Sequence, residues 1–345
     1  MKLEPQTLLH EPERDCAESQ SQRVPTRCGW SATQPRSGSG HLSRREFVKG
    51  SAALFGAALL SPNLFADDAV EAAPRKKRDI KKAILWPTPG RGTMAERFRM
   101  LKTAGFDGVE ARSGMNRDEV LRARDEAGLK IPSVCCKWDW EKPLSDPDPA
   151  VRAAGLEGLK VALNDAKTYG ASSVLLVPAV VNEKVSYQDA YERSQIEIRK
   201  AIPLAEELGV KIAIENVWNK FLLSPLEMAR YVDEFNSPAV GCHFDVGNVL
   251  AFGWPEHWIP VLGKRIQKLH IKEYSRKKQQ NEGMLKGFEV DYLEGDNNWP
   301  AIMKALDDIG YHGWAIAEPA FHPKGIEPAE RLKQIADKMD KILAL

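Results

Sequence analysis

Residues 211–216 read Lys-Ile-Ala-Ile-Glu-Asn, and residues 240–248 read Val-Gly-Cys-His-Phe-Asp-Val-Gly-Asn. In both stretches a short, nearly continuous apolar run ends at an acidic residue. Apolar runs of this length are typical of parallel strands that are buried on both faces. Similar runs recur along the chain, so eight strands are predicted, at residues 83–86, 108–111, 131–136, 173–178, 211–216, 240–245, 267–272 and 314–318.

Amphipathic segments separate these runs, with apolar residues spaced for one face of a helix. They lie at residues 93–104, 150–169, 187–208, 225–235, 299–309 and 328–343. Many segments end at a glycine, which takes the left-handed conformation past a helix end at little cost. These glycines are Gly105, Gly128, Gly170, Gly209 and Gly310. The alternation predicts an α/β fold, a single-domain (β/α)8 TIM barrel over residues 83–345. No Gly-x-Gly-x-x-Gly motif follows the first run, so a dinucleotide-binding fold has no support.

The segment before the barrel has the composition of a targeting sequence. Residues 1–40 are rich in Ser, Gln, Arg, Pro and Gly, which predicts disorder. The sequence Ser-Arg-Arg-Glu-Phe-Val-Lys at 43–49 then precedes a short apolar run and Ala66, as in a secretory signal. The arginine pair resembles the twin-arginine export motif. We therefore expect a disordered N-terminus and twin-arginine signal over residues 1–66, a solvated linker over 67–82, and an exported, periplasmic protein. The alternative is a chance arginine pair ahead of a buried helix.

Bulk composition narrows the class of partner. The 345 residues carry a net charge of +1, and 43% of them are hydrophobic. Phosphate backbones are bound by clustered Lys and Arg, so this balance gives no support to a nucleic-acid partner. The apolar run after the arginine pair is shorter than the roughly 20 residues that span a bilayer, so no stable membrane span is expected. Cys135, Cys136 and Cys242 show neither a disulfide framework nor a Cys-x-x-Cys metal spacing, and we expect buried apolar side chains.

Four consecutive strands of the predicted barrel end in residues that can bind a metal. They are Glu215, Asp245, His270 and Glu318. In TIM barrels the chemistry lies at the C-terminal ends of the strands. Three carboxylates and an imidazole converging there would be costly to bury without a cation. Mixed oxygen and nitrogen ligands suit Mn²⁺, Mg²⁺, Co²⁺ or Zn²⁺, and the sequence does not choose among these ions. One divalent metal ion is therefore the predicted cofactor.

The motifs around these residues resemble a known family. Ile-Ala-Ile-Glu-Asn at 212–216, Phe-Asp-Val-Gly-Asn at 244–248, Leu-His-Ile-Lys-Glu at 269–273 and Ala-Ile-Ala-Glu-Pro at 315–319 occur in this order. They are similar to the sugar-phosphate isomerase/epimerase family of xylose isomerase-like barrels, over about residues 80–345, and most of all to its hexulose-phosphate isomerase and pentulose-phosphate 3-epimerase branch. The resemblance implies that the four residues bind one divalent metal.

The same resemblance implies a reaction on a ketose through an enediolate, with Glu215 and Glu318 as the acid/base pair. A proton next to a carbonyl is removed by one carboxylate and returned by the other. A sugar is thus the expected partner, and related barrels often pair, so a homo-oligomer is possible. Further candidates for substrate contacts are Arg276, Lys272, Asn248, Glu110, Trp138 and His322.

Some of these candidates have an alternative role. Arg276 lies where similar ketose 3-epimerases carry a substrate-binding arginine, but it could belong to a solvated charge run. Asn248 stands where those enzymes often carry a histidine, so the chain departs there from their substrate-binding pattern. Trp86, Trp138 and Trp218 could form the floor of a sugar site or pack in the core. For His243, which shares the inward face with Asp245, we expect core packing. Residues 275–297 are polar and could cover the site as a lid.

Export changes the expected substrate, because phosphorylated sugars are usually kept inside the cell. We therefore expect an unphosphorylated keto-sugar or an oxidised glycoside, and a lyase or hydrolase reaction at the same site stays open. A DNA-repair endonuclease of the same barrel ancestry would use a multi-metal, His-rich site, and few histidines follow the signal. A non-catalytic, exported sugar-binding protein is the remaining alternative.

Overall fold

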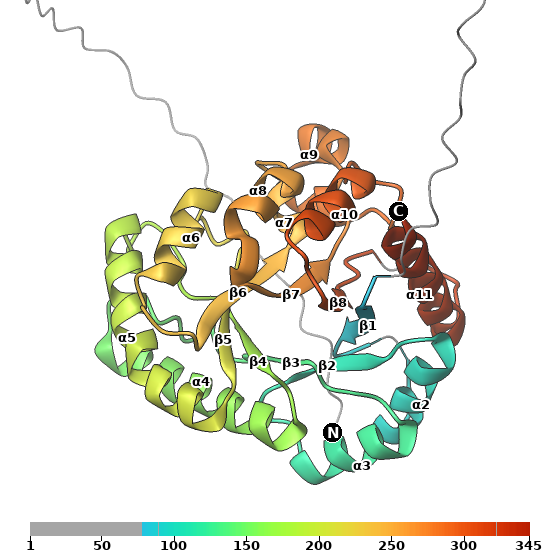
Figure 1. Cartoon of the computed structure of the whole chain (residues 1–345), viewed down its shortest axis with the longest axis horizontal. Helices are drawn as coiled ribbons and strands as arrows, with labels where there is room; N and C mark the ends of the chain where they lie inside the picture. Colours follow the sequence, from blue (N-terminus) through green and yellow to red (C-terminus); the bar gives the residue numbers. More distant parts are fainter. Residues whose placement is uncertain (1–77, 89, 322) are drawn as a thin grey trace, which may run out of the picture. The chain divides into compact units, whose positions relative to one another are not determined.

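The computed structural model describes residues 78–345, apart from residues 89 and 322. The predicted signal sequence, most of the predicted linker and His322 therefore lie outside the described residues. Eight parallel strands form a closed barrel in which each strand pairs with the next and β8 pairs with β1 (Figure 1). The predicted (β/α)8 barrel is confirmed. Its strands are β1 (Ile80–Leu85), β2 (Gly108–Arg112), β3 (Ser133–Cys135), β4 (Ser173–Leu176), β5 (Lys211–Glu215), β6 (Val240–Asp245), β7 (Ile266–Ile271) and β8 (Gly313–Ala317).

Helices surround the barrel and follow the strands in turn (Figure 1). They are α2 (Met94–Ala104), α3 (Arg117–Ala127), α4 (Pro149–Tyr169), α5 (Tyr187–Leu208), α6 (Pro225–Asp233), α7 (Val246–Leu250), α8 (Pro255–Leu262), α9 (Arg276–Glu282), α10 (Trp299–Asp308) and α11 (Pro328–Ala344), with the short 3-10 helices η1 (Gly263–Arg265) and η2 (Met284–Phe288). The five glycines predicted to follow helix ends all have positive φ, between 64° and 103°. No helix in the described part of the chain is long and apolar enough to cross a membrane.

Strand β1 begins at Ile80, earlier than the apolar pattern indicates. Its first residues pair with β8, Ile80 with Gly313 and Lys82 with Ala315. Lys82 is buried, and its Nζ lies 2.7 Å from Oδ2 of Asp340 in α11. A lysine that buries its aliphatic stem and keeps its ammonium group paired interrupts an apolar run without leaving the strand. That is why the sequence pattern places the start too late.

The segment 275–297, expected to be a polar lid, contains α9 and η2. Hydrogen bonds and an ion pair connect it to the rest of the barrel. The two terminal guanidinium nitrogens of the buried Arg331, Nη1 and Nη2, each donate to a carboxylate oxygen of Asp291 at 2.8 Å. Tyr292 donates a hydrogen bond to the carbonyl oxygen of Ile271, at 2.8 Å. Glu273 accepts hydrogen bonds from the backbone of Leu293 and from the Trp299 indole. These contacts hold the segment against β7 and α11.

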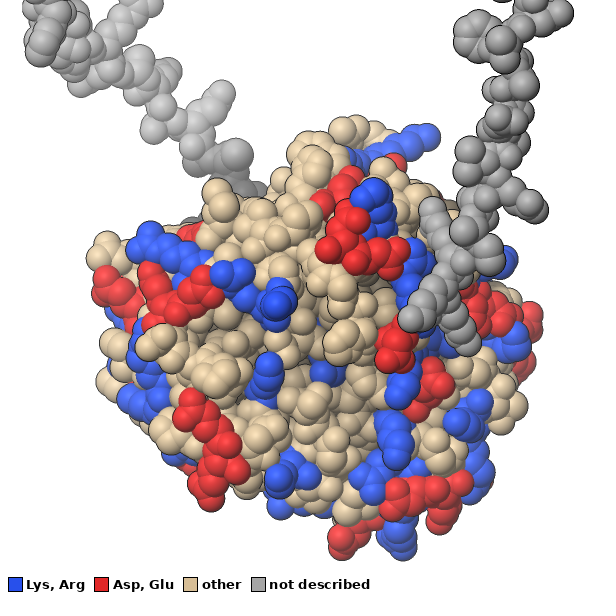
Figure 2. Space-filling view, viewed as in Figure 1, with Lys and Arg blue, Asp and Glu red and all other residues tan. Residues whose placement is uncertain are grey.

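Figure 2 shows basic and acidic side chains interspersed over the face in view, without a continuous area of either sign. Inside the barrel, by contrast, buried basic side chains lie in a row. Lys268 and His270 of β7, and Lys272, which directly follows the strand, are all buried. Because side chains alternate along an extended chain, these three side chains point to the same side. The strand therefore presents a row of cationic or titratable groups at increasing height in the barrel, with His270 and Lys272 near its C-terminal end.

Candidate metal centre and active site

The four residues predicted as metal ligands converge at the C-terminal end of the barrel. One ligand-type atom of each of Glu215, Asp245, His270 and Glu318 lies within 4.8 Å of all the others. His270 Nδ1 is the central atom of the group. It is 3.1 Å from Oε1 of Glu215, 2.9 Å from Oε2 of Glu318 and 3.8 Å from Oδ2 of Asp245. Four neighbouring strands thus bring three carboxylates to one nitrogen.

Hydrogen bonds between β5 and β6 orient Asp245. The Asn216 amide bridges both backbone groups of Asp245, accepting from its N–H at 2.9 Å and donating to its carbonyl oxygen at 2.7 Å. Oδ1 of Asp245 caps α7 by accepting the Asn248 N–H at 2.8 Å. The Asn248 side chain in turn donates to the Asn216 carbonyl, at 3.1 Å. One carboxylate oxygen of Asp245, Oδ1, therefore caps the N-terminus of α7, and the other, Oδ2, faces His270.

A buried lysine lies against two of the carboxylates. Lys272 Nζ is 3.1 Å from Oδ2 of Asp245 and 2.9 Å from Oε2 of Glu318, and it donates to Oδ1 of Asn248 at 3.2 Å. Burial works against the charge of Lys272, but the charges of Asp245 and Glu318 outweigh it and raise the pKa of the ammonium group. Lys272 is thus a fixed cation within the cluster.

The two glutamates differ in their protonation equilibria. Burial raises the pKa of Glu215 to about 7, against the opposing hydrogen bond and charge of His270. Burial also disfavours ionisation of Glu318, but Lys272 and then His270 outweigh it, and the pKa of Glu318 lies well below its usual range. Two carboxylates whose environments push their pKa values apart are the usual arrangement for an acid and a base in one site.

The donor set fits a divalent cation. Oδ2 of Asp245 and Oε2 of Glu318 are buried and have no hydrogen bond of good geometry within the described residues, although the Lys272 ammonium lies near both. Buried carboxylate oxygens are normally hydrogen-bonded or bound to a metal. Three carboxylates and one imidazole suit Mn²⁺, Mg²⁺, Co²⁺ or Zn²⁺. Glu215, Asp245, Glu318 and Nδ1 of His270 would hold the ion.

A pocket of about 150 Å³ opens onto this cluster. Among the residues predicted from the sequence, Glu215, His270, Glu318, Lys272 and Trp218 line it. The pocket also contains side chains that the sequence reasoning missed, namely Arg112, Cys135, Cys136, Lys137, Asp139 and Trp140. Two larger hollows lie over α5 and α6 and beside β6 and β7, and neither is lined by any of the four ligand-type residues.

The missed residues come from the ends of β2 and β3 and the loop after β3. Trp140 stacks on Trp218, with ring centroids 4.8 Å apart, and forms an aromatic wall of the pocket. Burial raises the pKa of Asp139 to about 7, although its carboxylate accepts the Val177 N–H at 2.9 Å. Cys135, expected to be a buried apolar side chain, is partly exposed and lines the pocket. Two tryptophans close together after β3, Trp138 and Trp140, indicate an aromatic surface near the site. The sequence does not show which of the two faces the pocket.

Several residues predicted to contact the substrate are absent from the lining of this pocket. Arg276 is held by the α7–α8 connection, donating to the carbonyl oxygens of Leu250 and Gly253, at 3.1 Å for Leu250, with its guanidinium over Trp254. Trp138 packs against Gly114 and Gly158, where an added Cβ would come within 2.9 and 3.2 Å of its ring. Neither residue lines the pocket described above.

Asn248 and Trp86 are also outside the pocket lining. Asn248 is buried in the network that orients Asp245 and Lys272. Trp86 packs edge-on against Phe98 and beneath the Arg97 guanidinium. Trp218 is thus the one of the three tryptophans considered from the sequence that reaches the pocket.

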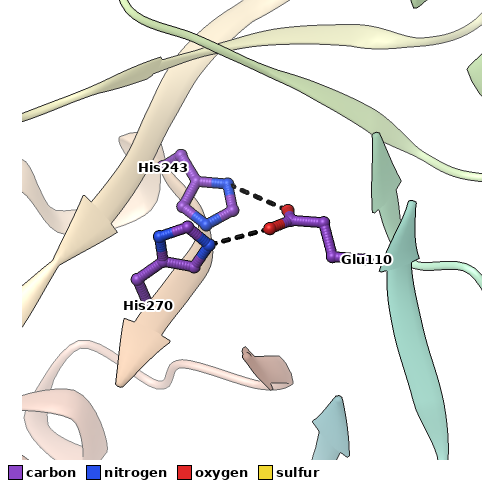
Figure 3. A group of neighbouring side chains, drawn as sticks. All are labelled: Glu110, His243 and His270. Atoms are coloured by element: carbon purple, nitrogen blue, oxygen red, sulfur yellow. Dashed lines mark hydrogen bonds and ion pairs between the residues drawn. The ribbon is translucent and has the colours of Figure 1, made fainter. Parts of the chain in front are cut away.

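Glu110 lies below the pocket rather than at its mouth. It is fully buried, and its Oε2 is 2.8 Å from Nε2 of His270 (Figure 3). His243 is also fully buried, as expected for core packing, and its ring meets that of His270 at a centroid distance of 4.2 Å. Burial, followed by the charges of His270 and Lys268, lowers the pKa of His243 well below its usual range, so that this ring is neutral.

The model of the xylose isomerase-like TIM barrel family matches residues 98–342. This protein belongs to that family. The match runs from within α2 to within α11 and includes all four ligand-type residues.

Relatives in this family include L-ribulose-5-phosphate 3-epimerase UlaE of Salmonella typhi, which is 29% identical over 241 residues, 65% of this chain and 81% of the relative. The same-named enzyme of Escherichia coli O1:K1 is 27% identical over 237 residues, again 65% and 81% of the two chains. Among solved structures, the apo form of 3-keto-D-glucoside 4-epimerase YcjR from E. coli has a TM-score of 0.66 at 17% identity and covers 77% of this chain and all of its own. The zinc-bound IOLI protein has a TM-score of 0.61 at 20% identity, covering 77% and 98%. At these identities the two structures support the fold of the family.

Proposed function

We propose that this protein is a divalent-metal-dependent epimerase or isomerase that acts on a ketose or keto-sugar derivative, with Glu215 and Glu318 as its acid/base pair. The enzyme class is supported by the relatives and structural neighbours, which are named as sugar epimerases. The observation that carries the proposal is the meeting of Glu215 and Glu318 at the same atom of His270, 3.1 and 2.9 Å from Nδ1, in a pocket that both residues line.

The chemistry follows from the two carboxylates. A ketose epimerisation removes a proton from the carbon next to a carbonyl and returns a proton to its opposite face. Glu318, which Lys272 and His270 keep ionised, is in the state that can receive the proton, and Glu215, whose pKa burial raises to about 7, is suited to donate one. A bound divalent cation would supply Lewis-acid stabilisation of the negative charge on the substrate oxygens. In the reverse direction the two glutamates exchange roles.

Other pocket residues would bind and orient the substrate. Lys272 keeps Glu318 ionised and could donate a hydrogen bond to an oxygen of the sugar. The stacked pair Trp140 and Trp218 offers an apolar surface to the face of a sugar ring. Such sites are commonly apolar walls with a few placed polar groups.

For the substrate, we propose an unphosphorylated keto-sugar or an oxidised glycoside. Two points support this: the expected export of the protein, and the structural likeness to 3-keto-D-glucoside 4-epimerase and to D-psicose 3-epimerase, which has a TM-score of 0.58. A phosphorylated ketose is the second candidate. It is favoured by the curated ribulose-5-phosphate 3-epimerases and by two cationic side chains in the pocket, Arg112 and Lys137.

Deuterium exchange would distinguish these substrates. Metal-loaded protein incubated in deuterated water is expected to incorporate deuterium next to the carbonyl of free ketoses or 3-keto-glycosides, because proton removal from that carbon precedes epimerisation. Mass spectrometry measures the label, and the matching phosphorylated ketoses serve as the comparison. Exchange restricted to phosphorylated sugars would overturn the substrate proposal and retain the reaction class. Saturable sugar binding without exchange into any of them would instead support the non-catalytic binding protein.

Periplasmic localisation by the twin-arginine pathway remains our proposal, and it has its own test. Replacing Arg44 and Arg45 with lysine keeps the charge but removes the guanidinium pair, and the protein is expected to stay in the cytoplasm. Cell fractionation and immunoblotting measure the distribution. An Arg36→Lys variant, which makes the same change ahead of the motif and leaves the arginine pair intact, should be exported like the wild type. Cytoplasmic wild-type protein, or export of the double variant, would contradict this assignment.

A further inference from the structure

A second group of titratable side chains lies directly beneath the candidate metal centre, on the inner faces of β2, β6 and β7. In Figure 3, Glu110 points from β2 toward the rings of His243 and His270, with one carboxylate oxygen directed at each ring. Oε2 of Glu110 is 2.8 Å from Nε2 of His270, and Oε1 is 3.9 Å from Nδ1 of His243. All three side chains are at most 1% exposed.

We propose that Glu110 is a positioning residue for the metal centre: by accepting the Nε2 proton of His270, it holds the imidazole in the tautomer that presents Nδ1 to Glu215, Asp245 and Glu318. This inference rests on the metal site of the proposed function. It replaces the sequence-based expectation that Glu110 contacts the substrate.

The geometry of the imidazole carries the argument. His270 is enclosed between acidic groups at both nitrogens, with Nδ1 2.9 Å from Glu318 and Nε2 2.8 Å from Glu110. A neutral imidazole has one N–H and one lone pair, and only the lone pair can bind a metal. The hydrogen bond at one nitrogen therefore decides which nitrogen is the ligand. A carboxylate at Nε2 keeps the proton there and makes Nδ1 the ligand atom.

Among the neighbours of His270, Glu110 is the residue placed to accept the Nε2 proton. His243 packs its ring against His270 at 67° and has no hydrogen bond at either nitrogen within the described residues. It is therefore a steric neighbour of His270 rather than a competing partner for Nε2. Glu110 is absent from the lining of the pocket and has no exposed surface. Its short contact, at 2.8 Å, is instead with His270 of the candidate metal centre.

Three variants separate positioning from a merely structural role. Glu110→Ala removes the acceptor, and Glu110→Gln keeps the side-chain shape and an amide oxygen that can still accept the Nε2 proton. Glu273→Gln is the matched control, because Glu273 is also a buried glutamate of this barrel but hydrogen-bonds Trp299 and Leu293 instead of His270. Each purified variant is first checked for a wild-type circular dichroism spectrum.

Metal affinity is the first readout, measured by titrating chelator-treated protein with Co²⁺ and following the visible absorption of the bound ion. Glu110→Ala is expected to weaken binding about 10- to 100-fold, the usual effect of losing a carboxylate behind a histidine ligand. Glu110→Gln should lose less, and Glu273→Gln should bind as the wild type does. If Glu110→Ala fails to fold, the ordering of Glu110→Gln against Glu273→Gln still decides the question.

The tautomer is the second readout, from nitrogen NMR of 15N-histidine protein loaded with Zn²⁺. The wild type should show His270 protonated at Nε2 and bound through Nδ1, and Glu110→Ala should show a change at this ring. Unchanged affinity and an unchanged His270 signal in Glu110→Ala would overturn the proposal. So would a stoichiometry of two ions per chain with His270 bound through both nitrogens, because Glu110 and His243 would then be ligands of a second ion. A wild type that binds no metal would overturn the proposed function as well, so the two failures are distinguishable.

Discussion

Replacing Glu318 with glutamine is expected to lower the rate of deuterium exchange and of epimer formation by at least about a hundredfold, within the 10²–10⁴ range typical of a lost general acid or base. Glutamine has nearly the same shape, but it cannot receive a proton. The fold should survive, because Lys272 keeps Asp245 as a partner at 3.1 Å. Turnover is measured with the substrate found by the exchange experiment, and folding by thermal unfolding.

The control for this substitution makes the same chemical change outside the site. Glu330 is exposed on α11 and does not line the pocket, and Glu330→Gln should turn over as the wild type does. Retained turnover in Glu318→Gln would sink the assignment of Glu318 as a proton-transfer group. Loss of the folded state together with turnover would leave the kinetic result uninterpretable, and Glu318→Asp, which retains a carboxylate, would then be compared for partial activity.

Removing the divalent cation with a chelator is expected to abolish exchange while leaving the barrel folded. Activity is lost because charge on the substrate oxygens is no longer stabilised. The fold persists because Lys272 lies 3.1 and 2.9 Å from Asp245 and Glu318 and compensates two of the three carboxylates. Adding back Mn²⁺, Mg²⁺, Co²⁺ or Zn²⁺ in turn should restore exchange and identify the effective ion.

The thermal stability of the same samples tests whether Lys272 compensates the negative charge of Asp245 and Glu318 when no metal is bound. A ligand at about 100 times its dissociation constant stabilises the native state by about 2.7 kcal/mol, so metal should raise the unfolding temperature of the wild type moderately. In Lys272→Met the metal-free state loses its cation, and its unfolding temperature should depend on metal more strongly. Full activity after chelation would contradict a catalytic metal. Equal metal dependence in both proteins would contradict the role given to Lys272.

The barrel and its four ligand-type residues could be predicted because their signals are local. Apolar runs such as 211–216 mark strands buried on both faces, and the helix-ending glycines mark where each unit closes. Parallel strands in a barrel all end on the same side, so the first acid or histidine after each run is brought to one place. Glu215, Asp245, His270 and Glu318 follow from that rule without knowledge of any contact. Strand β1 was predicted to start too late, because Lys81 and Lys82 interrupt its apolar run.

The direction of a loop side chain depends on tertiary packing, which the sequence pattern does not give. Trp138 and Trp140 lie two residues apart after β3, and Trp140 faces the pocket while Trp138 packs against Gly114 and Gly158. Arg276 lies near the expected site in sequence, but the carbonyl groups at Leu250 and Gly253 hold its guanidinium elsewhere. The pocket positions of Arg112 and Asp139 could not be predicted from the sequence, since single charged residues at strand ends and in loops are common.

What the sequence alone determined is therefore the barrel, the order of its strands and the set of ligand-type side chains at their ends, because period and strand direction are properties of the chain itself. Only the tertiary structure decided how those side chains are connected. It placed Glu110 of β2 against Nε2 of His270, which is 160 residues away in sequence, and it placed Lys272 between Asp245 and Glu318. The physical reason is that hydrogen bonds and ion pairs depend on distances across the barrel, which are settled when the strands close and the core packs.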